Sequence, residues 1–260
     1  MLINGIELNL EEHGAGTPLV LVHGLGANLR VWDAEVAHFS PGFRVITYDA
    51  RGHGKSTRPA SFALDDHVAD LRALVEILGD KPVALLGASM GSYIVQGLAS
   101  HFPSLVAKLV LVVPKCHGTT SSSARLLAAH ADDISHLSHR DRQIFLLNKA
   151  FAPQTPASVR EQVIATELSC FLDERAMHAA SNALAGFDFR DDLPRVTAQS
   201  LVICGSHDAL NPPEEGRACA QRIPHCEYVE LPQAGHFPGA EASQAYFAAL
   251  DAFLGRAARP

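Results

Sequence analysis

The chain has 260 residues, of which 47% are hydrophobic and 19% are charged, the composition of an ordinary globular protein. Its formal net charge is −7, and Lys and Arg are scattered without a basic run, so no nucleic-acid partner is expected. The opening MLINGIELNL lacks the features of a signal peptide, and no apolar stretch is long enough to span a membrane. The five cysteines lack the spacing of metal ligands, and we interpret them as reduced thiols. We therefore expect a cytoplasmic protein.

Short aliphatic and β-branched runs alternate with helical patterns along most of the chain. The runs that predict strands are residues 19–22, 44–48, 83–86, 109–113, 201–204 and 227–231. Apolar stripes at three- and four-residue spacing predict helices between and after them, as at residues 68–78 and 247–254. Near-continuous apolar strands separated by helices are typical of a mostly parallel sheet covered on both faces. The sequence therefore predicts an α/β fold built from right-handed βαβ crossovers.

The alternation stops over residues 115–195, where no convincing strand is present. Helical patterns occupy residues 124–130, 140–150, 157–171 and 174–185, joined by Pro- and Ser-rich pieces. We interpret this stretch as a helical insertion between two parts of one core, residues 1–114 and residues 196–260.

A G-x-S-x-G pattern, Gly87-Ala88-Ser89-Met90-Gly91, follows the predicted strand at residues 83–86 and precedes a helical pattern. A sharp strand-to-helix turn strains the serine backbone and needs glycines because side chains would clash there. Ser89 then lies at a helix N-terminus, where backbone N–H groups favour developing negative charge. A glycine-rich turn without chemistry is the alternative interpretation of this pattern alone.

A serine hydroxyl needs a base, and the base needs an orienting partner. Asp208 and His236 follow the predicted strands at residues 201–204 and 227–231. The three residues occur in the chain order Ser, Asp, His, each after a strand, and the carboxyl ends of parallel strands lie along one edge of a sheet. We predict that His236 takes the proton from Ser89 and that Asp208 orients the imidazole. Singly, a loop histidine is more often solvated, and Asp208 could be a turn residue.

A further glycine turn, His23-Gly24-Leu25-Gly26, directly follows the strand predicted at residues 19–22. Glycine here allows the backbone N–H of Leu25 to approach the serine. With the N–H of Met90 it would form a two-donor oxyanion hole.

These motifs, together with Asp49-x-Arg51-Gly-His-Gly-Lys-Ser56, resemble the α/β-hydrolase superfamily over nearly the whole chain. They are most similar to small cofactor-free serine hydrolases such as carboxylesterases and 3-oxoadipate enol-lactonases. The resemblance implies Ser89, Asp208 and His236 as the triad, Leu25 and Met90 as the oxyanion pair, and a helical cap at residues 115–195. Ser89 argues against the family's dehalogenases and epoxide hydrolases, which carry aspartate at that position. Glu241 also lacks the proline that often follows it in the family.

Two other patterns favour structure over chemistry. Gly54-Lys55-Ser56 lacks the upstream glycine of a phosphate-binding loop, and we interpret Arg51 and His53 as hydrogen-bonded scaffolding. The histidines and aspartates at residues 130–139 could be imagined as metal ligands, but a solvated polar helix accounts for them better.

The predicted reaction is acyl transfer to water on a small, largely apolar molecule, without a metal or organic cofactor. Trp32, Phe145, Phe151 and Phe237 are candidate pocket residues because small-molecule sites are mostly apolar. An esterase or lactonase is the favoured hypothesis. A C–C bond hydrolase or haloperoxidase-like enzyme on the same triad is the alternative enzyme, and a ligand receptor with little turnover is the alternative class. Nothing in the composition requires an obligate oligomer, and the sequence leaves the oligomeric state open.

Overall fold

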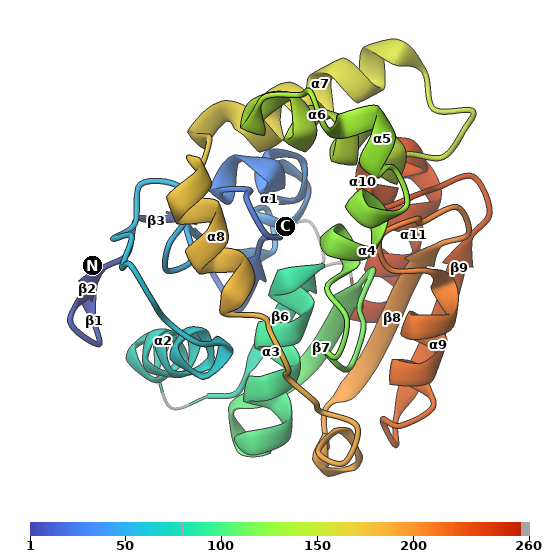
Figure 1. Cartoon of the computed structure of the whole chain (residues 1–260). Coiled ribbons are helices and arrows are strands. Elements are labelled where there is room, and N and C mark those ends of the chain that lie inside the picture. The colour runs from blue at the N-terminus through green and yellow to red at the C-terminus, as the bar shows by residue number, and fades with distance from the viewer. Residues whose placement is uncertain (80, 256–260) are drawn as a thin grey trace.

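A computed structural model of the chain describes residues 1–79 and 81–255. Its main sheet has the strand order β3-β5-β4-β6-β7-β8-β9, with β3 antiparallel to β5 and the other neighbours parallel (Figure 1). The strands are β3 (Leu10–His13), β4 (Thr17–Val22), β5 (Phe43–Tyr48), β6 (Val83–Ala88), β7 (Val106–Val112), β8 (Gln199–Gly205) and β9 (Cys226–Leu231). The mostly parallel α/β architecture and all six predicted strands are confirmed.

Helices cover both faces of this sheet, and alternate strand residues point to opposite faces. Along β4, Val20 and Val22 join a buried cluster with α2 (Leu64–Leu78) and α3 (Met90–His101). Leu19 and Leu21 join a second cluster on the other face, with α1 (Asp33–Phe39) and α11 (Ser243–Leu254). The remaining core helices are α9 (Pro213–Ala220) and α10 (Pro238–Glu241). Short 3₁₀ turns are η1 (Leu29–Trp32), η2 (Pro103–Leu105) and η4 (Leu193–Arg195).

The N-terminal strands were not predicted from the sequence. The hairpin of β1 (Leu2–Ile3) and β2 (Ile6–Glu7) has only two residues in each strand, and β3 reads LEEH, without an apolar run. An edge strand bonded on one side needs no continuous apolar sequence, because its position depends on the backbone of β5.

The stretch between β7 and β8 is helical, with α4 (Ser122–Ala128), α5 (Ala131–Ile134), α6 (His139–Ala150), α7 (Ala157–Glu167), the 3₁₀ turn η3 (Leu168–Cys170) and α8 (Glu174–Asn182). Figure 1 shows α5, α6 and α7 arching over the end of the sheet where β6, β7 and β8 finish. We keep the name helical insertion for residues 115–195. Helix α7 ends earlier than predicted because the chain tightens into η3 after Glu167.

Candidate active site

Ser89 occupies the sharp turn between β6 and α3. Its backbone has φ 51° and ψ −118°, a left-handed conformation that is strained for a residue other than glycine. The turn is held by a hydrogen bond from the Ser89 N–H to the carbonyl oxygen of Val112, at 3.0 Å. A Cβ added to Gly91 would overlap the carbonyl oxygen of Val22, and one added to Gly87 would overlap the Gly91 carbonyl. Glycines are therefore required at both positions because strand β4 and the turn pack backbone against backbone.

Asp208 and His236 form a buried pair beside this turn. The Nδ1 atom of His236 lies 2.7 Å from Oδ2 of Asp208, and both side chains are buried. Oδ1 of Asp208 accepts hydrogen bonds from the backbone N–H groups of Leu210 and Asn211, at 2.8 and 3.0 Å. These bonds fix the carboxylate so that its other oxygen faces the imidazole. With Nδ1 donating to Asp208, Nε2 of neutral His236 is left as a proton acceptor.

The charges around His236 favour its protonated form. Burial alone would lower the pKa of the imidazole, but the charge and hydrogen bond of Asp208, with smaller contributions from Glu167 and Glu241, raise the pKa of His236 overall. The carboxylate of Asp208 thus stabilises the imidazolium that forms when His236 takes up a proton.

Burial raises the pKa of Tyr93, one turn along α3, and an interaction with the Ser89 side chain opposes this rise. The Tyr93 hydroxyl accepts a hydrogen bond from Nδ2 of Asn211, at 2.9 Å. Within the described residues, the Ser89 hydroxyl makes no hydrogen bond to His236. Sequence reasoning did not single out Tyr93 or Asn211, because only the fold brings α3 beside the loop after β8.

The glycine turn after β4 approaches the serine closely. A Cβ on Gly24 would lie 3.4 Å from the Cβ of Ser89, so the backbone there is in contact with the nucleophile turn. His23 holds the turn: its Nε2 accepts from the N–H of Ala50 at 3.0 Å, and its Nδ1 lies 2.7 Å from the Gly24 carbonyl oxygen. The structure thus brings the segment containing Leu25 to the start of α3, where Met90 lies.

The Asp49–Ser56 segment is a network of structural hydrogen bonds. The Asp49 carboxylate accepts bonds from the backbone N–H groups of Leu29 and Lys55, both at 2.8 Å. Arg51 forms a bidentate pair with the buried Asp70, at 2.8 and 2.7 Å. Nothing in these contacts involves Ser89 or His236, which agrees with the scaffolding interpretation.

Glu241 is a residue of this site whose role the sequence did not reveal. Its Oε1 accepts hydrogen bonds from the N–H groups of Gly235 and Phe237, each at 3.0 Å. Its Oε2 accepts from the N–H of Ala152 at 2.7 Å and from the hydroxyl of Thr155 at 2.6 Å. One carboxylate therefore joins the histidine loop to the helical insertion. The sequence feature that could have indicated this role is the position of Glu241, five residues after His236.

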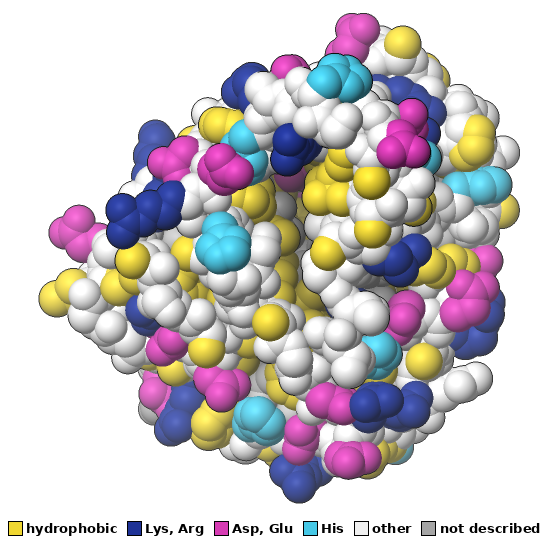
Figure 2. Space-filling view, viewed as in Figure 1, with side chains coloured by type: hydrophobic (Ala, Val, Ile, Leu, Met, Phe, Trp, Pro, Cys, Tyr) yellow, Lys and Arg dark blue, Asp and Glu magenta, His cyan; other side chains and the backbone are white. Residues whose placement is uncertain are grey.

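The four candidate pocket residues lie in different places. The rings of Phe151 and Phe237 are in tilted contact, with centroids 4.6 Å apart, and Phe237 contacts the ring of His236 edge-on. Trp32 packs in the core cluster between the sheet and α1, and Phe145 contacts His130 on the insertion. Figure 2 shows a hollow beneath the arch of the helical insertion, with hydrophobic side chains along its walls.

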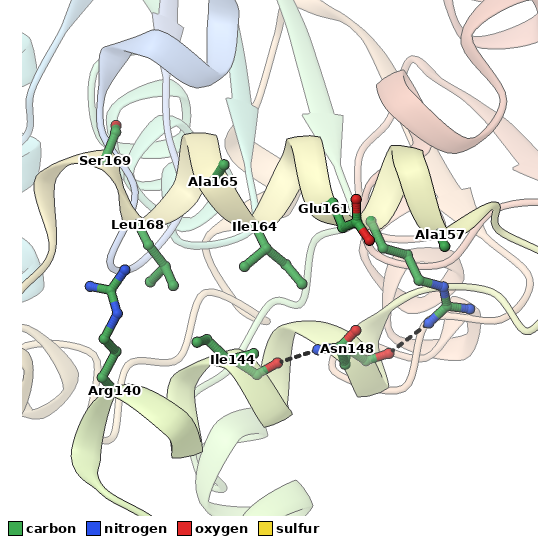
Figure 3. A pocket seen from close by; sticks show the side chains of 10 residues that line it. Arg140, Ile144, Asn148, Ala157, Glu161, Ile164, Ala165, Leu168 and Ser169 are labelled. Carbon is green, nitrogen blue, oxygen red and sulfur yellow. Dashed lines mark hydrogen bonds between the residues drawn. The ribbon is translucent and has the colours of Figure 1, made fainter.

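A separate cavity of about 650 Å³ lies between α6 and α7, lined by side chains such as Ile144, Ile164 and Leu168 (Figure 3). None of its lining residues is Ser89, Asp208 or His236, so the candidate active site rests on the geometry of those residues and not on this cavity. Among the described residues, no cluster of three or more His, Cys, Asp or Glu side chains suits a metal ion. No helix in the described part of the chain is long and apolar enough to cross a membrane.

Comparison with known proteins places these features in context. The family model for the α/β hydrolase fold matches residues 17–162. The 3-oxoadipate enol-lactonase 2 of Acinetobacter baylyi is 28% identical over 92% of this chain and 88% of its own. The crystal structure of the enol-lactonase from Burkholderia xenovorans LB400 superposes with a TM-score of 0.83 at 28% identity, covering 98% of each chain. A thermophilic esterase from Thermogutta terrifontis gives the same TM-score and identity, covering 96% of this chain and 93% of its own.

Proposed function

Because this chain belongs to the α/β-hydrolase family, we propose that it is a serine hydrolase that cleaves an ester or lactone bond in a small, largely apolar molecule. The proposal rests on the buried Asp208–His236 pair together with a serine in a strained strand-to-helix turn. The loop that carries Asp208 reaches the helix after this serine through the Asn211–Tyr93 hydrogen bond. The enol-lactonase and esterase among the relatives support the same class of bond.

The proposed reaction has two steps. Ser89 attacks the carbonyl carbon while Nε2 of His236 takes the hydroxyl proton, and the imidazolium is stabilised by Asp208. The backbone N–H groups of Leu25 and Met90 bind the oxyanion, and His236 then protonates the leaving group. In the second step His236 takes a proton from water, which attacks the acyl-enzyme. His236 then returns this proton to the Ser89 oxygen as the bond to the acyl group breaks and the acid leaves.

The resting geometry is compatible with this sequence of events. The Ser89 hydroxyl has to form a hydrogen bond to Nε2 of His236 before it can lose its proton. Hydrogen bonds between catalytic groups are often long or absent without substrate and form in the complex. No organic cofactor takes part in either proposed step.

We propose that the helical insertion acts as a cap over the substrate, between core parts 1–114 and 196–260. The hollow beneath it has hydrophobic walls, which suits an apolar acyl or alcohol group. Of the four candidate pocket aromatics, Phe151 and Phe237 have the best support, because Phe237 contacts His236 and Phe151 contacts Phe237.

The test is hydrolysis of p-nitrophenyl acetate, butyrate and octanoate by the wild type, by Ser89→Ala and by the control Ser61→Ala, whose serine is exposed. We expect Ser89→Ala to lose on the order of 10⁴-fold or more in kcat, and a fluorophosphonate to label the wild type and the control at Ser89. Equal activity in wild type and Ser89→Ala would overturn the assignment. Labelling at Ser89 without turnover of esters or lactones would leave the nucleophile but remove the proposed substrate class.

A further inference from the structure

Glu167 places a carboxyl group on the inward side of the helical insertion. It is the last residue of α7 and continues the row of Val159 and Val163 at four-residue spacing. These three side chains are half-buried, whereas Ser158 and Gln162, on the other side of the helix, are exposed. A carboxylate in a row that is otherwise apolar is unusual unless a partner compensates its burial.

The backbone around Glu167 is fixed onto the loop that carries the proposed oxyanion N–H. Nδ2 of the buried Asn28 donates to the hydroxyl oxygen of Ser169 at 2.9 Å and to the carbonyl oxygen of Thr166 at 3.4 Å. Asn28 follows Leu25 by three residues, so the end of α7 and the oxyanion loop are held together. The position of Glu167 over the site is therefore set by hydrogen bonds on both sides of it in sequence.

The Glu167 carboxyl interacts electrostatically with the imidazole of His236. Burial raises the pKa of Glu167 to about 7, and the positive charge of His236 opposes this rise. Glu167 in turn helps to raise the pKa of His236. Among the described residues, none donates a hydrogen bond to Glu167, which distinguishes it from Glu241 with its four donors. The Glu167 carboxyl therefore has no fixed hydrogen-bond donor in the described part of the chain.

We propose that Glu167 is the recognition site for a positively charged group, an ammonium, on the part of the substrate that lies beneath the helical insertion. The proposal rests on the proposed hydrolase function and adds the charge of its substrate. A carboxylate partly removed from water gains most from a cation that replaces its lost hydration. An apolar hollow with one unpaired carboxyl would bind a molecule that is apolar along its length and positive at one point.

The test compares esters of equal shape that differ in charge. For a cation in the alcohol part, the pair is acetylcholine and its uncharged isostere 3,3-dimethylbutyl acetate. For a cation in the acyl part, the pair is ethyl 4-(trimethylammonio)butanoate and ethyl 5,5-dimethylhexanoate. Wild type is compared with Glu167→Gln and with the control Glu161→Gln, an exposed glutamate on the same helix.

We expect the ratio of kcat/KM for the charged ester over the neutral ester to fall at least about 10-fold in Glu167→Gln, for one of the two pairs. The same ratio, and turnover of the neutral ester, should be unchanged in Glu161→Gln. An unchanged ratio for both pairs would overturn the proposal. An equal loss on charged and neutral esters would also overturn it, because Glu167 would then act on the reaction and not on substrate charge.

A binding measurement separates this proposal from the proposed function. Titration calorimetry with butyltrimethylammonium should show binding to the wild type and to Ser89→Ala that is weakened at least about 10-fold by Glu167→Gln. If the wild type hydrolyses none of the esters but binds the cation through Glu167, the proposed function fails and the cation site stands. If the esters are hydrolysed but the cation binds wild type and Glu167→Gln equally, the cation site fails alone.

Discussion

The carboxylate of Glu241 binds the backbone on both sides of His236. It accepts from the N–H groups of Gly235 and Phe237, while the N–H of His236 itself donates to the carbonyl oxygen of Ala150 at 2.8 Å. The same carboxylate holds Ala152 and Thr155 of the helical insertion. The Glu241 side chain therefore positions both the proposed base and the residues just before α7.

Glu241→Gln should weaken both attachments. A glutamine offers one oxygen where the carboxylate offers two, and its amide N–H₂ would face backbone donors. We expect a loss of about 1–3 kcal/mol in the free energy of unfolding, measured by urea denaturation, and a slower reaction with fluorophosphonate. The control is Glu227→Gln, an exposed glutamate in β9. Unchanged stability and labelling in Glu241→Gln would show that the histidine loop does not depend on this carboxylate.

Asp208→Asn should remove the orientation and charge that His236 depends on. The asparagine can still accept from Leu210 and Asn211, so the fold should be kept, but its amide can present N–H₂ to the imidazole and favour the wrong tautomer. We expect kcat to fall on the order of 10⁴-fold. Because Asp208 supplies the main contributions that raise the pKa of His236, that pKa should also fall, as measured by NMR titration of the imidazole. A pKa for His236 equal to that of the wild type would contradict this account.

Glu35 gives the protein a pH-dependent stability that is independent of catalysis. It is buried at 5% exposure on α1, and burial raises its pKa from 4.5 to about 7, against the opposing effect of hydrogen bonds from the backbone and Tyr246. Because the folded state holds this proton more tightly than the unfolded state, its contribution to stability falls as the pH rises from about 4.5 to about 7.

Glu35→Gln removes this titration. Relative to wild type, the variant should gain up to about 3 kcal/mol in the free energy of unfolding between pH 4.5 and pH 8, measured by chemical denaturation at several pH values. Glu161→Gln, at an exposed glutamate, is the control. A flat difference for Glu35→Gln would mean that Glu35 titrates normally in the folded protein.

Two glycines near Ser89 should respond differently to alanine. In Gly91→Ala the new Cβ would overlap the carbonyl oxygen of Val22, so the nucleophile turn and β4 would have to separate. We expect several kcal/mol of destabilisation or failure to fold, measured by thermal unfolding. In Gly24→Ala the Cβ meets Ser89 at an ordinary 3.4 Å contact, so the fold should survive and activity should fall instead. Near-wild-type stability of Gly91→Ala would contradict the close packing described here.

The amino-acid sequence by itself determined the order of strands and helices in the core, because each buried parallel strand needs a continuous apolar run and each covering helix needs an apolar stripe. It also determined which turns carry Ser89, Asp208 and His236, since each follows such a run. The edge strand β3 escaped prediction because its place depends on hydrogen bonds to β5 and not on its own side chains.

Only the tertiary structure decided which polar side chains meet. Glu241 joins the histidine loop to Ala152 and Thr155, residues more than 80 positions away in the chain, and Asn28 joins the oxyanion loop to Ser169. Glu167, on the helical insertion, interacts electrostatically with His236, and Asn211 donates a hydrogen bond to Tyr93 from the loop after β8. Hydrogen bonds and buried charges depend on distances of a few ångströms between segments that are remote in sequence. A periodic pattern of apolar residues specifies the elements, but it contains no measure of those distances.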